Sequence, residues 1–390
     1  MRNNMHGMIP GIVATIILGI CFATAATDES LPDPEAPGPY PVGVTTMTFV
    51  DHSRTDPLTN GPRTLLTEIW YPAADETRDL PPNKLSDFFL RGHSPELALI
   101  LFAGFGVELS EADAAFDNFA VRNARIREEG AFPLLLFSHG NGGLRMQNTF
   151  WCEHLASHGY IVMAPDHTGN CAITFINGEL VVMDSSREAR ERAAEDRPRD
   201  LSFLIDEMDN MNRGNDSRFL GRVDMERIGA AGHSFGGFTC TWLINEDARV
   251  KAIVPMAGVA ESQPGATCPV LLFIATEDIT LGAERVANIR DYYDNAQGPR
   301  YSVEFTDAGH FSFTEMYQLK PDFGDGVGHG KRITDGTPID YPPMEAVFPL
   351  VNAYSTAFLG KYLKGQDGYA AYLNENHAPE DVIHQAAPLP

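Results

Sequence analysis

The chain has 390 residues, of which 43% are hydrophobic, and it carries a formal net charge of −24. This length and apolar content suffice for a large core, and α/β folds of this size often form one domain. The acidic balance argues against nucleic acid and anionic membranes as partners, and it favours a solvated, solubilising surface.

The first 26 residues have the pattern of a secretory signal. Arg2 and His6 form a weakly basic start, residues 7–22 are apolar without charge, and residues 23–25 match the small-residue cleavage pattern. A membrane span is the alternative, but a bilayer crossing needs about 20 apolar residues. We therefore expect signal peptide 1–26 and a secreted or periplasmic protein without a stable membrane anchor.

Four cysteines lie beyond this segment: Cys152, Cys171, Cys240 and Cys268. In an exported protein an even number of cysteines permits two disulfide bonds, with three possible connectivities. Simple buried thiols are the alternative. Because no pair has the C-x-x-C spacing, a structural zinc site or a redox site is not expected.

The N-terminal part of the mature chain gives mixed signals. Residues 27–42 are rich in proline and acid and predict a loose arm, and strands follow at 42–50 and 64–71. Residues 73–130 are expected to form an insertion with helical patterns, for example at 112–128.

A regular alternation of strands and helices begins at residue 132, where the continuous apolar run 132–137 is typical of a strand buried on both faces of a parallel sheet. Further strands are expected at 160–164, 227–231, 251–256, 269–274 and 301–305, and helices at 147–158, 199–211, 238–244, 281–293 and 344–363. This order predicts a single α/β domain over 43–375, a mostly parallel sheet with helices on both faces. A second, polar insertion is expected at 172–196 and a C-terminal tail at 376–390.

The run 232–237, with the sequence Gly-His-Ser-Phe-Gly-Gly, is the strongest functional signal. It lies between an expected strand and an expected helix, which is the G-x-S-x-G nucleophile elbow of α/β-hydrolases. The turn lifts the hydroxyl of Ser234 off the sheet, and the amide of Phe235 at the helix start can bind an oxyanion. The alternative is a glycine-rich turn that holds an ordinary serine.

A hydrolase elbow needs an acid and a histidine later in the chain, at the carboxyl ends of strands. Asp278 follows the strand at 269–274, and His310 follows the strand at 301–305. His310 is expected to take the proton of Ser234, and Asp278 to hold the imidazole and stabilise its cation.

Three other titratable residues compete for these roles. Glu277 neighbours Asp278 but should point the other way off the strand end, and Glu261 follows the preceding strand, where some hydrolases place the acid. His329 lies in the glycine-rich stretch 323–329.

A second oxyanion donor should come from the loop after the strand at 132–137. Residues 138–143 form an H-G-x-G-G run, in which the amide of Asn141 is the expected donor. Neither a metal nor a cofactor is expected. His154 and His158 have helical spacing but no third ligand, and therefore predict surface histidines.

These motifs together resemble the platelet-activating-factor acetylhydrolase branch of the α/β-hydrolases. The likeness rests on residues 69–72, 137–140, 155–162 and 232–237 and covers about residues 65–320. It implies a secreted serine esterase of lipid degradation that cleaves short or oxidised acyl groups from small ester substrates. It carries over Ser234, Asp278 and His310 as a triad, and Asn141 and Phe235 as oxyanion donors.

Several alternatives stay open. Bacterial cutinases and polyester hydrolases look similar but typically have an aromatic residue at the position of Asn141 and a tryptophan near residues 257–259, which are Ala-Gly-Val here. Dienelactone hydrolases use cysteine at the position of Ser234. The alternatives are a lipase or cutinase that acts on longer lipids or polyesters, a serine peptidase, and a non-catalytic binding protein of the same fold.

Overall fold

The computed structural model describes residues 1, 31–89, 103, 108–214, 218–261, 264–315 and 322–388. The expected signal peptide, apart from residue 1, and residues 27–30 of the expected arm lie outside the described residues. A compact unit begins at Leu31.

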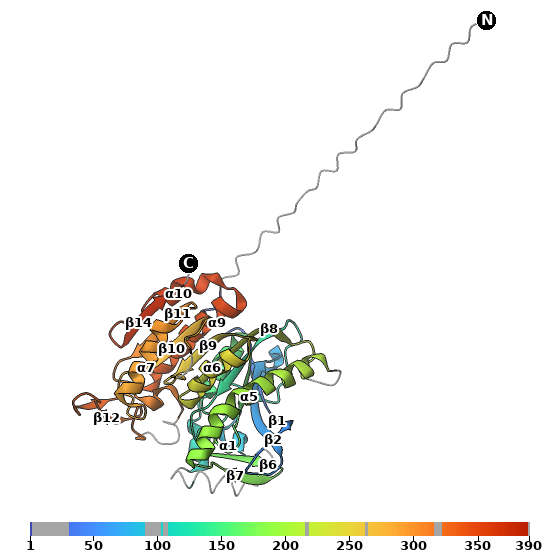
Figure 1. Ribbon diagram of the computed structural model, residues 1–390. Coiled ribbons are helices and arrows are strands. Elements are labelled where there is room, and N and C mark those ends of the chain that lie inside the picture. Colours follow the sequence, from blue (N-terminus) through green and yellow to red (C-terminus); the bar gives the residue numbers. More distant parts are fainter. Residues whose placement is uncertain are drawn as a thin grey trace. The chain divides into compact units, whose positions relative to one another are not determined.

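A ten-stranded sheet forms the centre of this unit (Figure 1). Its order is β14-β11-β10-β9-β8-β4-β5-β2-β1-β3. The six strands from β11 to β5 run parallel, while β2 and β14 are antiparallel to their inner neighbours. The strands are β1 (Val42–Thr55), β2 (Pro62–Pro72), β3 (Val121–Arg122), β4 (Phe132–Ser138), β5 (Ile161–Pro165), β8 (Val223–His233), β9 (Val250–Met256), β10 (Val270–Ala275), β11 (Arg300–Phe305) and β14 (Val382–Ala387). The expected mostly parallel α/β fold is confirmed.

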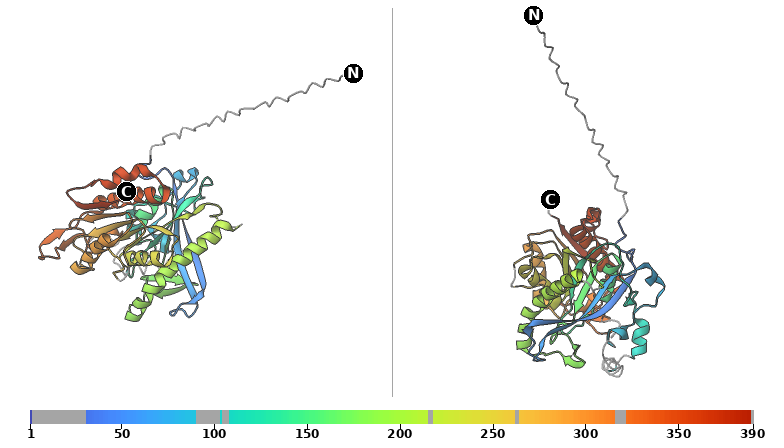
Figure 2. Two further views of the ribbon diagram at one scale, coloured as in Figure 1. Left: turned by 45° about the horizontal axis from the view of Figure 1, so that its top comes forward. Right: turned by 90° about the vertical axis from the view of Figure 1, so that its right-hand side faces the viewer.

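Helices cover both faces of the sheet, as the two views of Figure 2 show. Because side chains alternate along a strand, Leu135 and Phe137 of β4 pack with α4 and α9, whereas Leu134 and Leu136 pack on the opposite side. The first side is covered by α4 (Thr149–Ser157) and α9 (Met344–Lys364), and the second by α5 (Arg187–Arg213), α6 (Phe235–Glu246) and α7 (Gly282–Asn295).

The two insertions differ from the expected pattern. The first contains η1 (Asp75–Asp79), α1 (Leu85–Phe89), α3 (Leu109–Ala115) and β3, so the helix expected to reach residue 128 is wrong. The second forms a hairpin of β6 (Ile173–Ile176) and β7 (Glu179–Val182) and then enters α5. This helix begins at Arg187 after the N-cap Ser186, whose hydroxyl accepts a hydrogen bond from the Ala189 amide, and it continues through Pro198. The helix expected to start at 199 therefore starts twelve residues earlier.

The described part of the arm, residues 31–41, is not loose. His154 and His158, on the inner side of this segment, donate from Nε2 to the carbonyls of Pro34 (3.1 Å) and Ala36 (2.9 Å). Both histidines are buried, so the expectation that they lie on the surface is wrong. Proline prevents the segment from forming regular structure, but its carbonyl groups remain available as acceptors.

The C-terminal tail also differs from expectation, because residues 382–387 form β14 and extend the sheet beside β11. The chain between β11 and β14 contains η2 (His310–Phe313), the hairpin of β12 (His329–Lys331) and β13 (Pro338–Asp340), α9, η3 (Asp367–Tyr369) and α10 (Ala370–Asn374). Within the described residues, no helix is both long and apolar enough to cross a membrane.

All four described cysteines are free, so the disulfide prediction is wrong and the alternative of separate thiols holds. Cys152 packs with the α4 and α9 side of the core, whereas Cys240 and Cys268 pack with the α5 to α7 side. The sheet therefore separates Cys152 from the latter two.

Candidate active site

Ser234 lies between β8 and α6 in a backbone conformation that side chains rarely adopt, with φ 56° and ψ −117°. Its glycine neighbours make the turn possible. A Cβ on Gly236 would lie 1.7 Å from the Ser138 carbonyl oxygen, and one on Gly232 would lie 2.4 Å from the backbone of Gly236. Only glycine permits this approach, which holds the half-buried Ser234 at the carboxyl end of the sheet.

The loops after β10 and β11 bring Asp278 and His310 together. His310 Nδ1 lies 2.7 Å from Asp278 Oδ2, and both side chains are almost fully buried. Since a carboxylate only accepts, Nδ1 carries the proton and Nε2 is the basic nitrogen of the neutral ring. The second oxygen of Asp278 accepts from the Leu281 amide at 2.7 Å, which fixes the carboxylate.

Two residues that position His310 were missed in the sequence. His233 donates from Nε2 to the His310 carbonyl at 2.8 Å, and the ring centroids of the two histidines are 4.7 Å apart. Asp325 accepts from the His310 amide at 3.0 Å and from the amides of Ile279 and Thr280 at 2.9 and 2.8 Å. Asp325 therefore connects the loop of the base to the loop of the acid. A polar residue within a glycine-rich loop was the one available signal.

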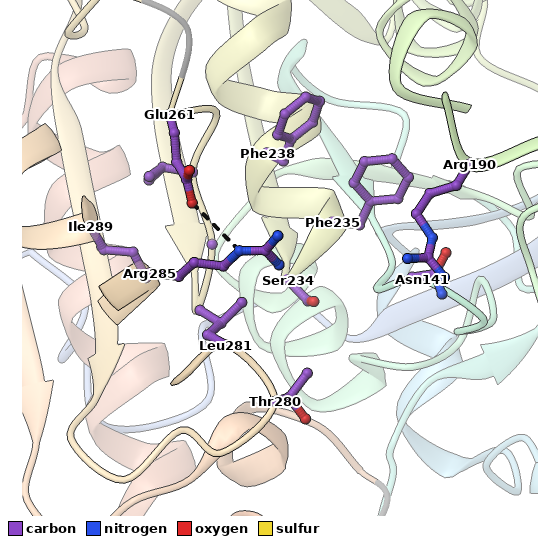
Figure 3. Close-up of a pocket in the computed structure, with 12 residues that line it drawn as sticks. Asn141, Arg190, Ser234, Phe235, Phe238, Glu261, Thr280, Leu281, Arg285 and Ile289 are labelled. Atoms are coloured by element: carbon purple, nitrogen blue, oxygen red, sulfur yellow. Dashed lines mark ion pairs between the residues drawn. The ribbon is translucent and has the colours of Figure 1, made fainter. Parts of the chain in front are cut away.

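A pocket of about 540 Å³ opens at the elbow. It brings Ser234 together with both expected oxyanion donors, Phe235 and Asn141 (Figure 3). Phe235 is the first residue of α6, so its amide has no carbonyl partner within the helix. The remaining lining residues are Arg190, Phe238, Gly258, Val259, Glu261, Thr280, Leu281, Arg285 and Ile289.

The three competing residues have other partners. Glu277 accepts from the Ile333 amide at 2.7 Å, and Glu261 faces Arg285 at 3.7 Å. His329 is exposed and pairs with Asp340 at 2.6 Å. Among the described residues, the carboxylate bonded to the imidazole of His310 is that of Asp278.

A second set of serine, histidine and aspartate lies beneath the loop that carries Asn141. Ser138 Oγ lies 3.0 Å from His167 Nε2, and His167 Nδ1 lies 2.9 Å from Asp200 Oδ2. All three side chains are fully buried. Burial, reinforced by nearby Arg197, lowers the pKa of His167 to about 3, so this imidazole is a neutral structural group. No pattern in the sequence indicates this set.

The fully buried Arg197 of α5 links the second set to the pocket. Nη2 donates to Ser138 Oγ at 2.8 Å and to the His139 carbonyl, and Nη1 donates to Asn170 Oδ1 at 2.8 Å. The guanidinium also lies 4.7 Å from the ring centroid of Phe235. Burial lowers the pKa of Arg197 to about 9, which leaves it charged at neutral pH.

Comparison with known proteins agrees with this architecture. Residues 25–193 match the family model described as platelet-activating factor acetylhydrolase, isoform II, and residues 143–319 match the model described as PET hydrolase-like. The chain is 26% identical over 390 residues to platelet-activating factor acetylhydrolase of Cavia porcellus, covering 90% of this chain and 84% of the relative.

A probable 1-alkyl-2-acetylglycerophosphocholine esterase of Arthroderma benhamiae is 26% identical over 269 residues, covering 63% of each chain. The solved structure of a ferulic acid esterase from Streptomyces cinnamoneus superposes with a TM-score of 0.65 at 27% identity, covering 86% of this chain and 94% of that one.

Fold, pocket and relatives together define a carboxylic ester hydrolase of the α/β-hydrolase fold. This sets aside the alternative of a non-catalytic binding protein. Within that superfamily the chain is similar to the platelet-activating factor acetylhydrolase branch.

Proposed function

We propose that the protein is a secreted serine esterase that hydrolyses short-acyl or small esters with Ser234, His310 and Asp278. The observations that carry this proposal are the strained Ser234 at a pocket and a buried histidine, His310, whose Nδ1 is bonded to a carboxylate and whose carbonyl accepts from His233, the residue before Ser234. The relatives named as acetylhydrolases support the short acyl group.

In the proposed mechanism, His310 Nε2 accepts the proton of Ser234 as Oγ attacks the ester carbonyl. The amides of Asn141 and Phe235 stabilise the oxyanion, and Asp278 stabilises the imidazolium. His310 then protonates the departing alcohol, which leaves an acyl-serine. A water molecule, deprotonated by His310, releases the acid and restores the enzyme.

A labelling experiment tests the proposed nucleophile. A fluorophosphonate probe should label the wild-type protein at Ser234 and leave a folded Ser234→Ala variant unlabelled. Ser138→Ala, which removes the buried serine, is the matched control and should still be labelled. Labelling that persists in Ser234→Ala would overturn the assignment of the nucleophile.

A hydrolase of longer lipids or polyesters is the second candidate, and the match of residues 143–319 to the PET hydrolase-like model favours it. kcat/KM for p-nitrophenyl esters from two to sixteen acyl carbons separates the two. A maximum at short acyl groups supports the proposal. A maximum at long groups, with activation above the micellar threshold, supports the lipase.

Export is proposed from the apolar N-terminal segment of the sequence. Mass spectrometry of the protein recovered outside the cytoplasm should find a mature N-terminus near residue 27. An intact N-terminus on a protein retained in the cytoplasm would contradict export.

A further inference from the structure

Two arginines line the pocket on opposite sides of Ser234. Arg190 comes from α5, near Asn141 and Phe235, and Arg285 comes from α7 (Figure 3). Among the described residues that line the pocket, one is a carboxylate, that of Glu261. In a chain with a net charge of −24, a pocket with two guanidinium groups and one carboxylate is locally positive.

These arginines retain hydrogen-bonding capacity for a ligand. Arg285 lies 3.7 Å from Glu261, and the side chains are 63% and 48% exposed, so this ion pair is weak. The Arg190 side chain has no hydrogen bond or ion pair within the described residues. The neighbouring arginines of the same helix differ, because Arg187 pairs with Glu191 and Arg192 pairs with Asp184.

We propose that the pocket binds esters that carry an anionic oxyacid group, a carboxylate or a phosphate, and that Arg190 is the main contact of this group. The planar fork of a guanidinium matches both groups and can bind them with two parallel hydrogen bonds. Because the rest of the protein repels anions, the local arginines determine whether such a substrate enters. This proposal rests on the proposed esterase function and names the substrate class of its pocket.

The test compares esters that differ in charge. p-Nitrophenyl butyrate and p-nitrophenyl hemisuccinate have acyl groups of equal carbon number, and the second is anionic. The acetyl esters of 4-hydroxybenzoate and of 4-hydroxyphenyl phosphate place a carboxylate or a phosphate on the leaving group instead. In the wild type, kcat/KM should be higher for at least one anionic ester than for its neutral counterpart. Arg190→Gln should lower kcat/KM for that anionic ester about 10-fold.

Arg187→Gln is the matched control, because it removes an equal charge from the same helix at a residue that does not line the pocket. It should leave kcat/KM unchanged for the neutral and the anionic esters, whereas Arg190→Gln should lower kcat/KM far more for the anionic esters than for the neutral ones. Equal losses on neutral and anionic esters, or a wild-type preference for neutral esters throughout, would overturn the proposal.

Binding to a Ser234→Ala protein separates this proposal from the esterase function. Calorimetry should show tighter binding of the anionic ester, lost in the Ser234→Ala, Arg190→Gln double variant. Failure of the esterase function would appear as absence of turnover by the wild type while this binding difference persists.

The buried Arg197 supports a second inference, which uses other observations and rests on the proposed oxyanion donors. It contacts the ring of Phe235, and it donates to the His139 carbonyl in the loop of Asn141 and to the side chain of Asn170 in the loop after β5. The Asn170 side chain in turn donates from Nδ2 to Asn141 Oδ1 at 2.9 Å, and the Asn170 backbone carbonyl accepts from the Gly142 amide at 2.9 Å. We infer that Arg197 is a positioning residue that sets the spacing of the two oxyanion donors.

Arg197→Lys tests this role, because lysine keeps the charge but lacks the fork that bridges these partners. kcat should fall about 100-fold with KM nearly unchanged, since the loss of one oxyanion contact has this size. Affinity for a boronate transition-state analogue should fall in parallel, while affinity for the carboxylate product stays the same.

Arg122→Lys is the control for the loss of a largely buried arginine, because the Arg122 side chain is 11% exposed, pairs with Glu68 at 2.8 Å and does not line the pocket. It should lower Tm without changing kcat. If Arg197→Lys does not fold, Asn170→Ala removes the second link to Asn141 and should lower kcat about 10-fold. An unchanged kcat in a folded Arg197→Lys or Asn170→Ala protein, or a raised KM alone, would overturn the inference.

Discussion

The two sets of serine, histidine and aspartate contain the same side chains and differ in their surroundings. In both, the histidine Nδ1 lies within 2.9 Å of a carboxylate oxygen. Ser234, however, lines a pocket, whereas Ser138 is fully buried and already accepts a hydrogen bond from Arg197. A histidine bonded to a carboxylate near a serine therefore does not by itself define an ester hydrolase site, because the hydroxyl must also reach a substrate.

The carboxylates differ in the same way. Asp200 is bonded to Arg63 at 2.6 Å and to Arg54 at 2.8 Å in addition to His167. Burial alone would raise the pKa of Asp200, but Arg63 and the hydrogen bonds lower it well below its usual range. Asp278, by contrast, accepts from His310 and a loop amide. The buried set therefore holds α5 to β1 and β2, and we propose that the chemistry belongs to the other set.

The largest expected effect separates the two serines. Ser234→Ala should lower kcat by several orders of magnitude and leave only the catalysis of the oxyanion hole and binding, about 10³–10⁴ over water. Ser138→Ala should retain most activity and lose stability, since it leaves buried partners unsatisfied. Ester turnover and thermal unfolding of both variants measure this. Near-wild-type turnover in Ser234→Ala would show that Ser234 is not the nucleophile.

The two aspartates should differ almost as strongly. Asp278→Asn should lower kcat about 10⁴-fold with little change of fold, because the amide favours the wrong tautomer of His310. Asp200→Asn should act mainly on stability, since it leaves Arg63 without a full counter-charge. Glu261→Gln is the matched control in the pocket. A larger loss of kcat in Glu261→Gln than in Asp278→Asn would show that the acid is misassigned.

Substitution of Asp325, which connects the loops of His310 and Asp278, should lower kcat by a smaller factor. Asp325→Ala removes the acceptor shared by the amides of His310, Ile279 and Thr280, so the imidazole and its carboxylate should shift relative to each other. A displacement of this kind can cost about 10- to 100-fold in kcat. Asp322→Ala, in the same loop, should be neutral. Equal kcat values in the two variants would exclude a positioning role.

The sequence predicted the parts of the fold that local patterns determine. The run 132–137 is apolar throughout because β4 is buried on both faces of the sheet. The elbow can be identified in the sequence because only glycine tolerates its close backbone contacts. Asp278 and His310 were found from their places after strands, and the structure brings the two together.

The parts that long-range contacts determine were missed. The docking of residues 31–41 depends on His154 and His158, which are more than 100 residues away along the chain. β14 exists because β11 offers it an edge. Likewise Ser138, His167 and Asp200 come from three separate elements, and no spacing in the sequence relates them.

The smallest expected effect concerns the stability of the buried set at acidic pH. Burial lowers the pKa of His167 to about 3, against about 6.5 in the unfolded chain, so between these values the unfolded state binds more protons. Stability should therefore rise with pH across this window and be lost as pH falls below about 6.5, by up to about 1.4 kcal/mol per pH unit for this one histidine. His154 and His158, with pKa values lowered by burial to about 3 and about 4, act in the same direction.

Guanidinium denaturation from pH 4.5 to 7 measures this slope. His167→Gln should be less stable at pH 7 because it loses the hydrogen bonds to Ser138 and Asp200. On acidification its free energy of unfolding should fall less steeply than that of the wild type, and the difference in slope should correspond to about one bound proton. His52→Gln, at an exposed position, should leave the slope unchanged. A slope in His167→Gln equal to that of the wild type would mean that His167 is already protonated in the folded protein. The interpretation of His167 as a neutral structural group, in contrast to the proposed base His310, would then be wrong.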